Sequence, residues 1–182
     1  ELMGRLTYAE AVYLVLKGEL PTTKQRRLID AMLVCAVDHG VKAPSAKTAR
    51  MAATSRPPLL AAVAAGMLAI TEYHGGAIEG AMRAITEVDQ GRAAGMSVDE
   101  AARAVVKARR QAGVRIPGFG HRVHTVDPRT QRLFAILGED GEVSRFVGIV
   151  EAIQRALEAE LGRPLPINVD GAMAAVLCEL GF

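Results

Sequence analysis

Hydrophobic residues recur at helical spacing through most of the chain, and short turn signals separate one apolar stripe from the next. "TYAE" at Thr7–Glu10 has the form of a capping box, which predicts a first helix that stops at Gly18 and Pro21. A threonine at 22–23 can cap a second helix that ends near Gly40. The start of the chain therefore predicts two short amphipathic helices.

Similar signals for helix starts and ends continue along the rest of the chain. Pro57 and Pro58 suit the first turn of a helix whose apolar run is too short to cross a bilayer, which needs about 20 residues. "SVDE" at 97–100 is a second capping box. No strand longer than about four residues suggests itself, so the predicted fold class is mostly α. The helices expected after residue 40 cover 45–55, 57–70, 75–88, 97–112, 128–137, 143–161 and 172–180.

Composition supports helices and excludes some classes of partner. Half of the residues are hydrophobic but only 4% are aromatic, and a core of small aliphatic side chains favours packed helices over sheets. The 22 basic and 20 acidic residues leave a net charge of +2, with no dense basic run. We therefore expect no nucleic-acid partner and no membrane partner. A chain of 182 residues suits one domain, or one large domain with a lobe.

The cysteines and the chain ends lead to two further expectations. Cys35 and Cys178 both fall in apolar helical stretches, which favours buried thiols in a reducing, cytoplasmic compartment over a disulfide. The chain starts at Glu1 without a methionine and stops at Phe182 soon after a helix begins. We therefore expect the sequence to be incomplete.

The segment "IPGFGHRVHTVDPR" at 116–129 interrupts the helical pattern and holds two of the four histidines. His121 and His124 have the H-x-x-H spacing that can indicate zinc. No cysteine or second histidine pair lies at a helpful spacing, and the segment is not a helix that would align the two rings. We therefore predict no metal here.

The same region is better suited to binding an anion. Arg115, Arg122 and Arg129 offer guanidinium groups that match a carboxylate or a phosphate through two hydrogen bonds. The glycines leave backbone amides open to a substrate, and a neutral histidine in such a place can donate to a carbonyl and polarise it.

Three other short polar segments lie between helices. "DHG" at 38–40 suits a helix C-terminus, where a histidine is commonly a cap. In "YHGGA" at 73–77, the glycines let a ligand approach the backbone, although a capped helix start needs no ligand. In "NVD" at 168–170, Asp170 suits either a helix N-cap or a catalytic base. Two histidine donors and one carboxylate base are the groups that enolate chemistry requires.

In their order along the chain, these segments resemble the citrate synthase superfamily from Glu1 to Phe182. The similar segments are "GRLTYAEAVYLVLKGELPT", "DHG", "YHGGAIEGAM", "PGFGHRVHTVDPR" and "NVDGAMAAVLCELGF". The resemblance implies a citrate synthase-like multi-helix fold. It also implies a large helical domain at about 1–90 and 165–182, with a smaller helical lobe at about 95–162.

The resemblance also implies roles for individual residues. His74 matches the histidine that stabilises the enol of acetyl-CoA, His121 the one that polarises the oxaloacetate carbonyl, and Asp170 the catalytic base. The residues that match oxo-acid-binding groups are His39, Arg122 and Arg129. Those that fall where the family binds coenzyme A are Arg115, Ile116, Pro117, Gly118 and Asn168.

The implied activity makes or breaks the carbon–carbon bond between acetyl-CoA and oxaloacetate through citryl-CoA, as an acyltransferase or a lyase. The CoA thioester is a substrate, and no permanently bound cofactor is expected. "DHG", "GHRV" and "NVDG" look more like the citryl-CoA lyase branch, which includes the lyase module of ATP-citrate lyase. That branch often has an aromatic residue where this chain keeps His74, which leaves both directions open.

Three further expectations remain open at this stage. A 2-methylcitrate synthase that uses propionyl-CoA and a catalytically silent CoA-binding homologue are the alternatives to the leading function. The Ala-rich helices at 59–70 and 75–88 have little polar surface, which predicts a homodimer. Arginine segments that the family carries downstream would lie beyond Phe182.

Overall fold

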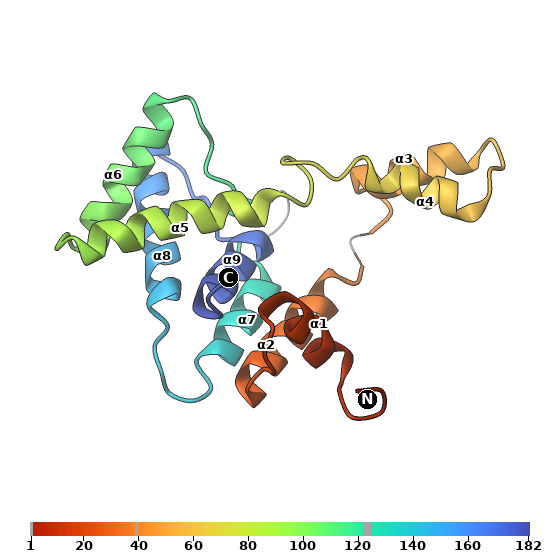
Figure 1. Cartoon of the computed structure of the whole chain (residues 1–182). Helices are drawn as coiled ribbons and strands as arrows, with labels where there is room; N and C mark the ends of the chain where they lie inside the picture. The colour runs from red at the N-terminus through yellow and green to blue at the C-terminus, as the bar shows by residue number, and fades with distance from the viewer. Residues whose placement is uncertain (1, 39, 122–124) are drawn as a thin grey trace.

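The computed structural model describes residues 2–38, 40–121 and 125–182, and within these ranges the chain is almost entirely helical (Figure 1). Strand pairing there is limited to isolated bridges, such as the one between Phe119 and Ile167. The mostly α fold class is confirmed. The helices are α1 (Tyr8–Lys17), α2 (Thr23–Ala36), α3 (Pro44–Ala53), α4 (Leu59–Met67), α5 (Ala77–Ala93), α6 (Val98–Gln111), α7 (Pro128–Leu137), α8 (Arg145–Leu161) and α9 (Val169–Glu179).

Most helix starts agree with the capping signals. Thr7, Thr22 and Ser97 each accept a hydrogen bond from the backbone of the residue three positions on, and each capping box is complete. Two predicted starts are slightly wrong. Helix α3 begins at Pro44, and Pro58 precedes α4 as its N-cap instead of lying in its first turn. Proline fits both places because neither requires its missing N–H.

Helix α9 lies at the centre of the body that α1, α2 and α5–α9 form (Figure 1). One buried cluster joins α9 to α5, α6 and α8, and a second joins it to α1, α2 and α7. Four small or medium residues of α9 have no exposed surface: Ala172, Ala174, Ala175 and Val176. Most residues of α9 are buried, as expected for a helix that is apolar on nearly all sides. The division into a large domain and a smaller lobe stays a prediction.

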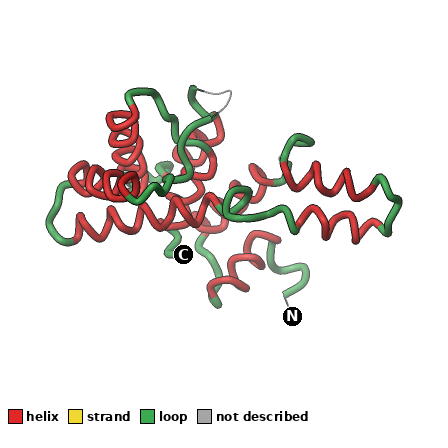
Figure 2. Tube along the Cα trace, turned by 90° about the horizontal axis from the view of Figure 1, so that it is seen from above, coloured by secondary structure: helices red, strands yellow, loops and turns green. Residues whose placement is uncertain are grey.

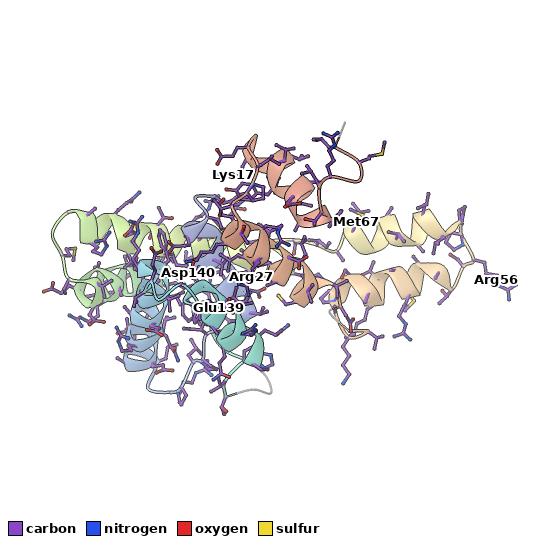
Figure 3. The ribbon with its side chains drawn as sticks, turned by 90° about the horizontal axis from the view of Figure 1, so that it is seen from below. Lys17, Arg27, Arg56, Met67, Glu139 and Asp140 are labelled. Atoms are coloured by element: carbon purple, nitrogen blue, oxygen red, sulfur yellow. The ribbon has the colours of Figure 1, made fainter. Side chains whose placement is uncertain are left out.

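Helices α3 and α4 form a hairpin that projects away from the body (Figures 1 and 2). The two helices pack closely because Gly66 has no side chain: a Cβ there would lie 2.9 Å from both the Ala49 Cβ and the Ser45 carbonyl oxygen. Figure 3 shows Arg56 at the far tip and Met67 at the end nearer the body. The outward side chains of α4 are largely exposed, with Leu59 and Leu60 close to 80%.

The two cysteines are free, and no helix within the described ranges combines enough length and apolar character to span a lipid bilayer. Cys178 is buried, and burial raises the pKa of its thiol to about 11. Cys35 is only partly buried, in contrast to the expectation. Burial raises its thiol pKa as well, so both thiols are neutral at physiological pH.

Candidate active site

Two of the polar segments between helices, the loop before α7 and the segment before α9, are joined directly by backbone hydrogen bonds. The Gly120 amide donates to the Pro166 carbonyl at 2.6 Å, and the Asn168 amide donates to the Gly118 carbonyl at 3.1 Å. Gly118 has a φ of +89°, and a Cβ there would lie 2.8 Å from the Gly171 Cα. The loop before α7 therefore lies against the first turn of α9 at a distance that only two facing glycines allow.

A cavity of about 720 Å³ lies where the interruptions meet. Its volume is within the range of small-molecule sites, about 300–1,000 Å³. It is lined from the α4–α5 turn by Tyr73 and Gly76, and from the start of α9 by Asp170. The predicted CoA-binding residues that also line it are Arg115, Pro117, Gly118 and Asn168. Residues more than 90 positions apart in the sequence thus share one cavity.

The turn before α5 holds His74 in a defined orientation. The His74 amide and carbonyl both bond to Thr71, at 3.0 and 2.8 Å. The ring Nε2 lies 3.3 Å from the Ser45 amide, which donates to it, and 2.9 Å from the Ser45 hydroxyl. Because a backbone N–H can only donate, Nε2 is the accepting nitrogen, and the proton of the neutral ring is on Nδ1. His74 can therefore donate a hydrogen bond from Nδ1.

The start of α9 separates two roles that the sequence left open for Asp170. Asn168 is the N-cap: its side-chain oxygen accepts from the Asp170 amide at 3.0 Å and the Gly171 amide at 3.3 Å. Its side-chain nitrogen donates to the Gly120 carbonyl at 3.0 Å. The N-cap role for Asp170 was wrong, because the helix begins at Val169 and Asp170 already lies inside its first turn. The Asp170 carboxylate is in the first turn and lines the cavity.

Arg129 is paired with a carboxylate of its own chain. Its Nε and Nη2 donate to Asp127 Oδ1 and Oδ2 at 3.1 and 2.9 Å. Burial alone would raise the pKa of Asp127, but the hydrogen bonds and charge of Arg129, together with His121, hold that pKa below its ordinary value of 3.8. The bonds to Asp127 also raise the pKa of Arg129, with a smaller contribution from Asp170. Both partners are therefore charged at neutral pH.

The remaining predicted residues fall in different places. His121 is partly buried at the end of the loop, and its charge reaches Asp127. The Ile116 side chain is 4% exposed and packs in the core. His39, Arg122 and the neighbouring His124 lie outside the described residues. Among the described residues, no group of three or more histidine, cysteine, aspartate or glutamate side chains is arranged to hold a metal ion.

Sequence reasoning missed two residues that position others. Asp127 caps α7 by accepting from the Arg129 amide at 3.0 Å, which the Asp-Pro pair at the helix start could have indicated. Ser45 was assigned only as a helix start, and no local signal links it to His74, 29 residues away.

Over residues 1–182 the chain matches the protein family described as citrate synthase, C-terminal domain. It is 31% identical over 184 residues to citrate synthase of Deinococcus radiodurans, covering 97% of this chain and 46% of that protein. It is 29% identical over 160 residues to the probable ATP-citrate synthase of Caenorhabditis elegans, covering 85% of this chain and 14% of that protein. The chain therefore spans less than half the length of these two relatives.

Solved structures agree with this match. Citryl-CoA lyase from Hydrogenobacter thermophilus superimposes with a TM-score of 0.85 at 42% identity, covering 100% of this chain and 68% of that one. The ATP citrate lyase of Methanothrix soehngenii, solved with citrate and coenzyme A, gives a TM-score of 0.81 at 22% identity. That match covers 96% of this chain and 28% of the other, and it shows the shared fold alone.

Proposed function

Because the chain belongs to the citrate synthase family, we propose that it makes or cleaves the carbon–carbon bond between the acetyl group of acetyl-CoA and oxaloacetate, through citryl-CoA. One observation carries the proposal. The cavity of about 720 Å³ is lined by Asp170, by residues of the loop at 115–118 and by Tyr73 and Gly76 on either side of His74 in the turn before α5, which supports the proposal. A carboxylate base, a histidine donor and a glycine-lined path for a thioester arm are the parts that this chemistry needs.

In the direction of synthesis, the Asp170 carboxylate takes a proton from the methyl group of acetyl-CoA. His74 donates from Nδ1 to the thioester oxygen and stabilises the enolate that forms. The enolate carbon attacks the keto carbon of oxaloacetate, and His121 donates to the keto oxygen as it becomes a hydroxyl. Cleavage runs the same steps backwards: His121 takes the hydroxyl proton, the carbon–carbon bond breaks, and Asp170 returns a proton to the methyl carbon.

Of the two directions, cleavage of citryl-CoA is better supported. The 42% identity to a citryl-CoA lyase extends over the whole chain, whereas the citrate synthase of Deinococcus radiodurans is 31% identical. The retained His74 keeps synthesis followed by thioester hydrolysis as the second candidate. Hydrolysis would release free CoA, and cleavage would not, so one pair of assays separates them.

The experiment uses the full-length protein with two substrate sets. Oxaloacetate released from citryl-CoA is followed through malate dehydrogenase and NADH, and free CoA released from acetyl-CoA plus oxaloacetate is followed with DTNB. A lyase should give oxaloacetate without free CoA, and a synthase should give free CoA in the second assay. A parallel run with propionyl-CoA tests the 2-methylcitrate alternative.

Two variants tie the result to the cavity. Asp170→Asn should lower either activity by roughly 10²–10⁴-fold, because a general base is lost. Asp140→Asn removes a carboxylate that pairs with Lys24 of α2. Figure 3 shows Asp140 on the side of the molecule near Arg27 and Glu139. This variant should leave activity unchanged. If the wild-type protein is inactive in every assay but still binds CoA, the silent homologue is the correct alternative.

We also propose that the protein is a homodimer formed through the α3–α4 hairpin. The two Ala-rich helices differ in the structure, because α5 is covered by α9, α6 and α8 within one chain. Of these two helices, α4 keeps an uncovered apolar face, on which Leu59, Leu60 and Met67 are each more than 60% exposed. A second copy of the same hairpin offers a face of matching character. A cytoplasmic location is part of the same proposal, supported by the two free thiols.

A further inference from the structure

Asp127 is unusual in where it lies. Among the described residues it is the only charged side chain in the buried class, and its carboxylate has no exposed surface. Transferring an ionised carboxylate out of water is costly unless charged and polar partners replace the water. A buried carboxylate that is kept ionised must therefore have a dense set of donors.

Four donors surround the Asp127 carboxylate, and they come from two helices. Arg129 of α7 supplies its amide at 3.0 Å, Nε at 3.1 Å and Nη2 at 2.9 Å. The fourth donor is the amide of Val169, the first residue of α9, at 3.2 Å. One carboxylate thus ties the start of α7 to the start of α9, directly beside Asp170.

The pairing also determines which edge of the Arg129 guanidinium remains for a ligand. A guanidinium carries five N–H donors in a fixed plane, and it can bind one carboxylate along the Nε–Nη2 edge and another along the Nη1–Nη2 edge. Asp127 occupies the first edge. No bond among the described residues uses the second edge, and the Arg129 side chain is 35% exposed.

We propose that Asp127 is a positioning residue for the reaction: it holds Arg129 by one edge so that the other edge meets a carboxylate of the oxo-acid. The inference rests on the proposed function, because it assumes a dicarboxylate substrate. Without Asp127 the long arginine side chain would sample many rotamers, and the substrate would have to order it on binding. Asp127 acts through Arg129 and does not touch the substrate.

The test is Asp127→Asn, which keeps the size of the side chain but replaces one accepting oxygen with an NH₂ group. The KM for oxaloacetate, or the dissociation constant measured with oxaloacetate or citrate alone, should rise roughly 10–100-fold. The kcat at saturating oxo-acid should fall by less than about tenfold, because Asp170 and both histidines remain.

A neighbouring bond provides the matched control. The Thr130 hydroxyl donates to the Ile167 carbonyl at 3.2 Å, so it also joins α7 to the segment before α9, but it does not contact Arg129. Thr130→Val should lower the stability of the fold because it also removes a hydrogen bond between α7 and the segment before α9. It should leave the KM for oxaloacetate within about threefold of wild type. If the two variants change KM alike, Asp127 is merely structural and the inference is overturned.

A double mutant shows whether the effect passes through Arg129. In an Arg129→Gln background, adding Asp127→Asn should change the KM no further, because the group that Asp127 orients is gone. Fully additive effects would refute the inference and leave the proposed function standing. A wild-type protein that binds oxaloacetate but catalyses neither direction would refute the proposed function, and the binding measurements would still decide the role of Asp127. A wild-type protein that binds neither oxaloacetate nor citrate would overturn both.

Discussion

The contact between Gly118 and Gly171 allows a quantitative test of how the site is held together. In Gly118→Ala, the new methyl group would lie 2.8 Å from the Gly171 Cα and 3.1 Å from the Ala81 Cβ. Forcing a methyl group into such a contact costs about 1–3 kcal/mol. The left-handed backbone, with φ at +89°, adds about 1–2 kcal/mol for a residue with a Cβ. The variant should therefore lose about 2–5 kcal/mol of stability.

Two other glycines separate the two contributions. Gly95 has a φ of +99° with no atom within 4 Å of a built Cβ, so Gly95→Ala should show the backbone cost alone, about 1–2 kcal/mol. Gly148 is inside α8 and also has open space, so Gly148→Ala should be stabilising by about 0.5–1 kcal/mol. The free energy of unfolding is measured in urea by circular dichroism, with the m-value checked for constancy.

Activity gives the second measurement for the same three variants. Only Gly118→Ala moves the loop at 115–118 relative to Asp170, so it alone should lower kcat/KM in the folded protein. If Gly118→Ala matches Gly95→Ala in both stability and activity, the loop can move away from α9 at no cost. The close approach would then not determine the geometry of the cavity.

Three further predictions concern charge, association and catalysis. The pKa of Asp127 is lowered in the folded state, so its stabilising effect is complete above the ordinary value of 3.8 and is lost as the pH falls through the lower folded value. Acid titrations of unfolding should therefore show the stability gap between wild type and Asp127→Asn as constant above about pH 5 and shrinking below 3.8. Leu60→Glu on the hairpin should give a monomer in light scattering at micromolar concentration. Val15→Glu, at a similarly exposed position on α1, should remain a dimer. A dimer in both variants would contradict the hairpin interface. His121→Ala should mainly lower kcat, by roughly 10²–10³-fold, and Arg129→Ala should mainly raise the KM for the oxo-acid. The reverse pattern of kcat and KM in these two variants would contradict both roles. Arg129→Ala should also destabilise the fold, by less than the ~3–5 kcal/mol lost when a fully buried ion pair is broken, because Arg129 is partly exposed.

The helices were predictable because their signals are local. A capping box lies within four residues, and the predicted span of α7 agrees with the structure at both ends. The same local logic left the role of Asp170 open, because Asn168 and Asp170 are both good caps and only the structure shows which one the backbone uses.

The site was only partly predictable, since its internal bonds link distant segments. The sequence indicates that histidines, arginines and a carboxylate gather in interruptions, but not that Ser45 bonds His74 or that Val169 bonds Asp127. Pairings of this kind depend on how helices pack, which no residue pattern encodes locally. Arg129 shows the consequence: an arginine predicted to bind substrate already has a partner in the protein.

The bond between Ser45 and His74 also crosses the joint between the hairpin and the body. Ser45 belongs to α3, and His74 lies in the turn that leads from α4 back into α5. If a second copy covers the hairpin, as we propose, dimerisation helps to hold the hairpin in place, and the fraction of chains with a well-oriented His74 should follow the law of mass action. Activity per chain should then depend on total protein concentration. Dilution should lower it, because His74 loses its fixed orientation as dimers dissociate, without unfolding of any helix of the body.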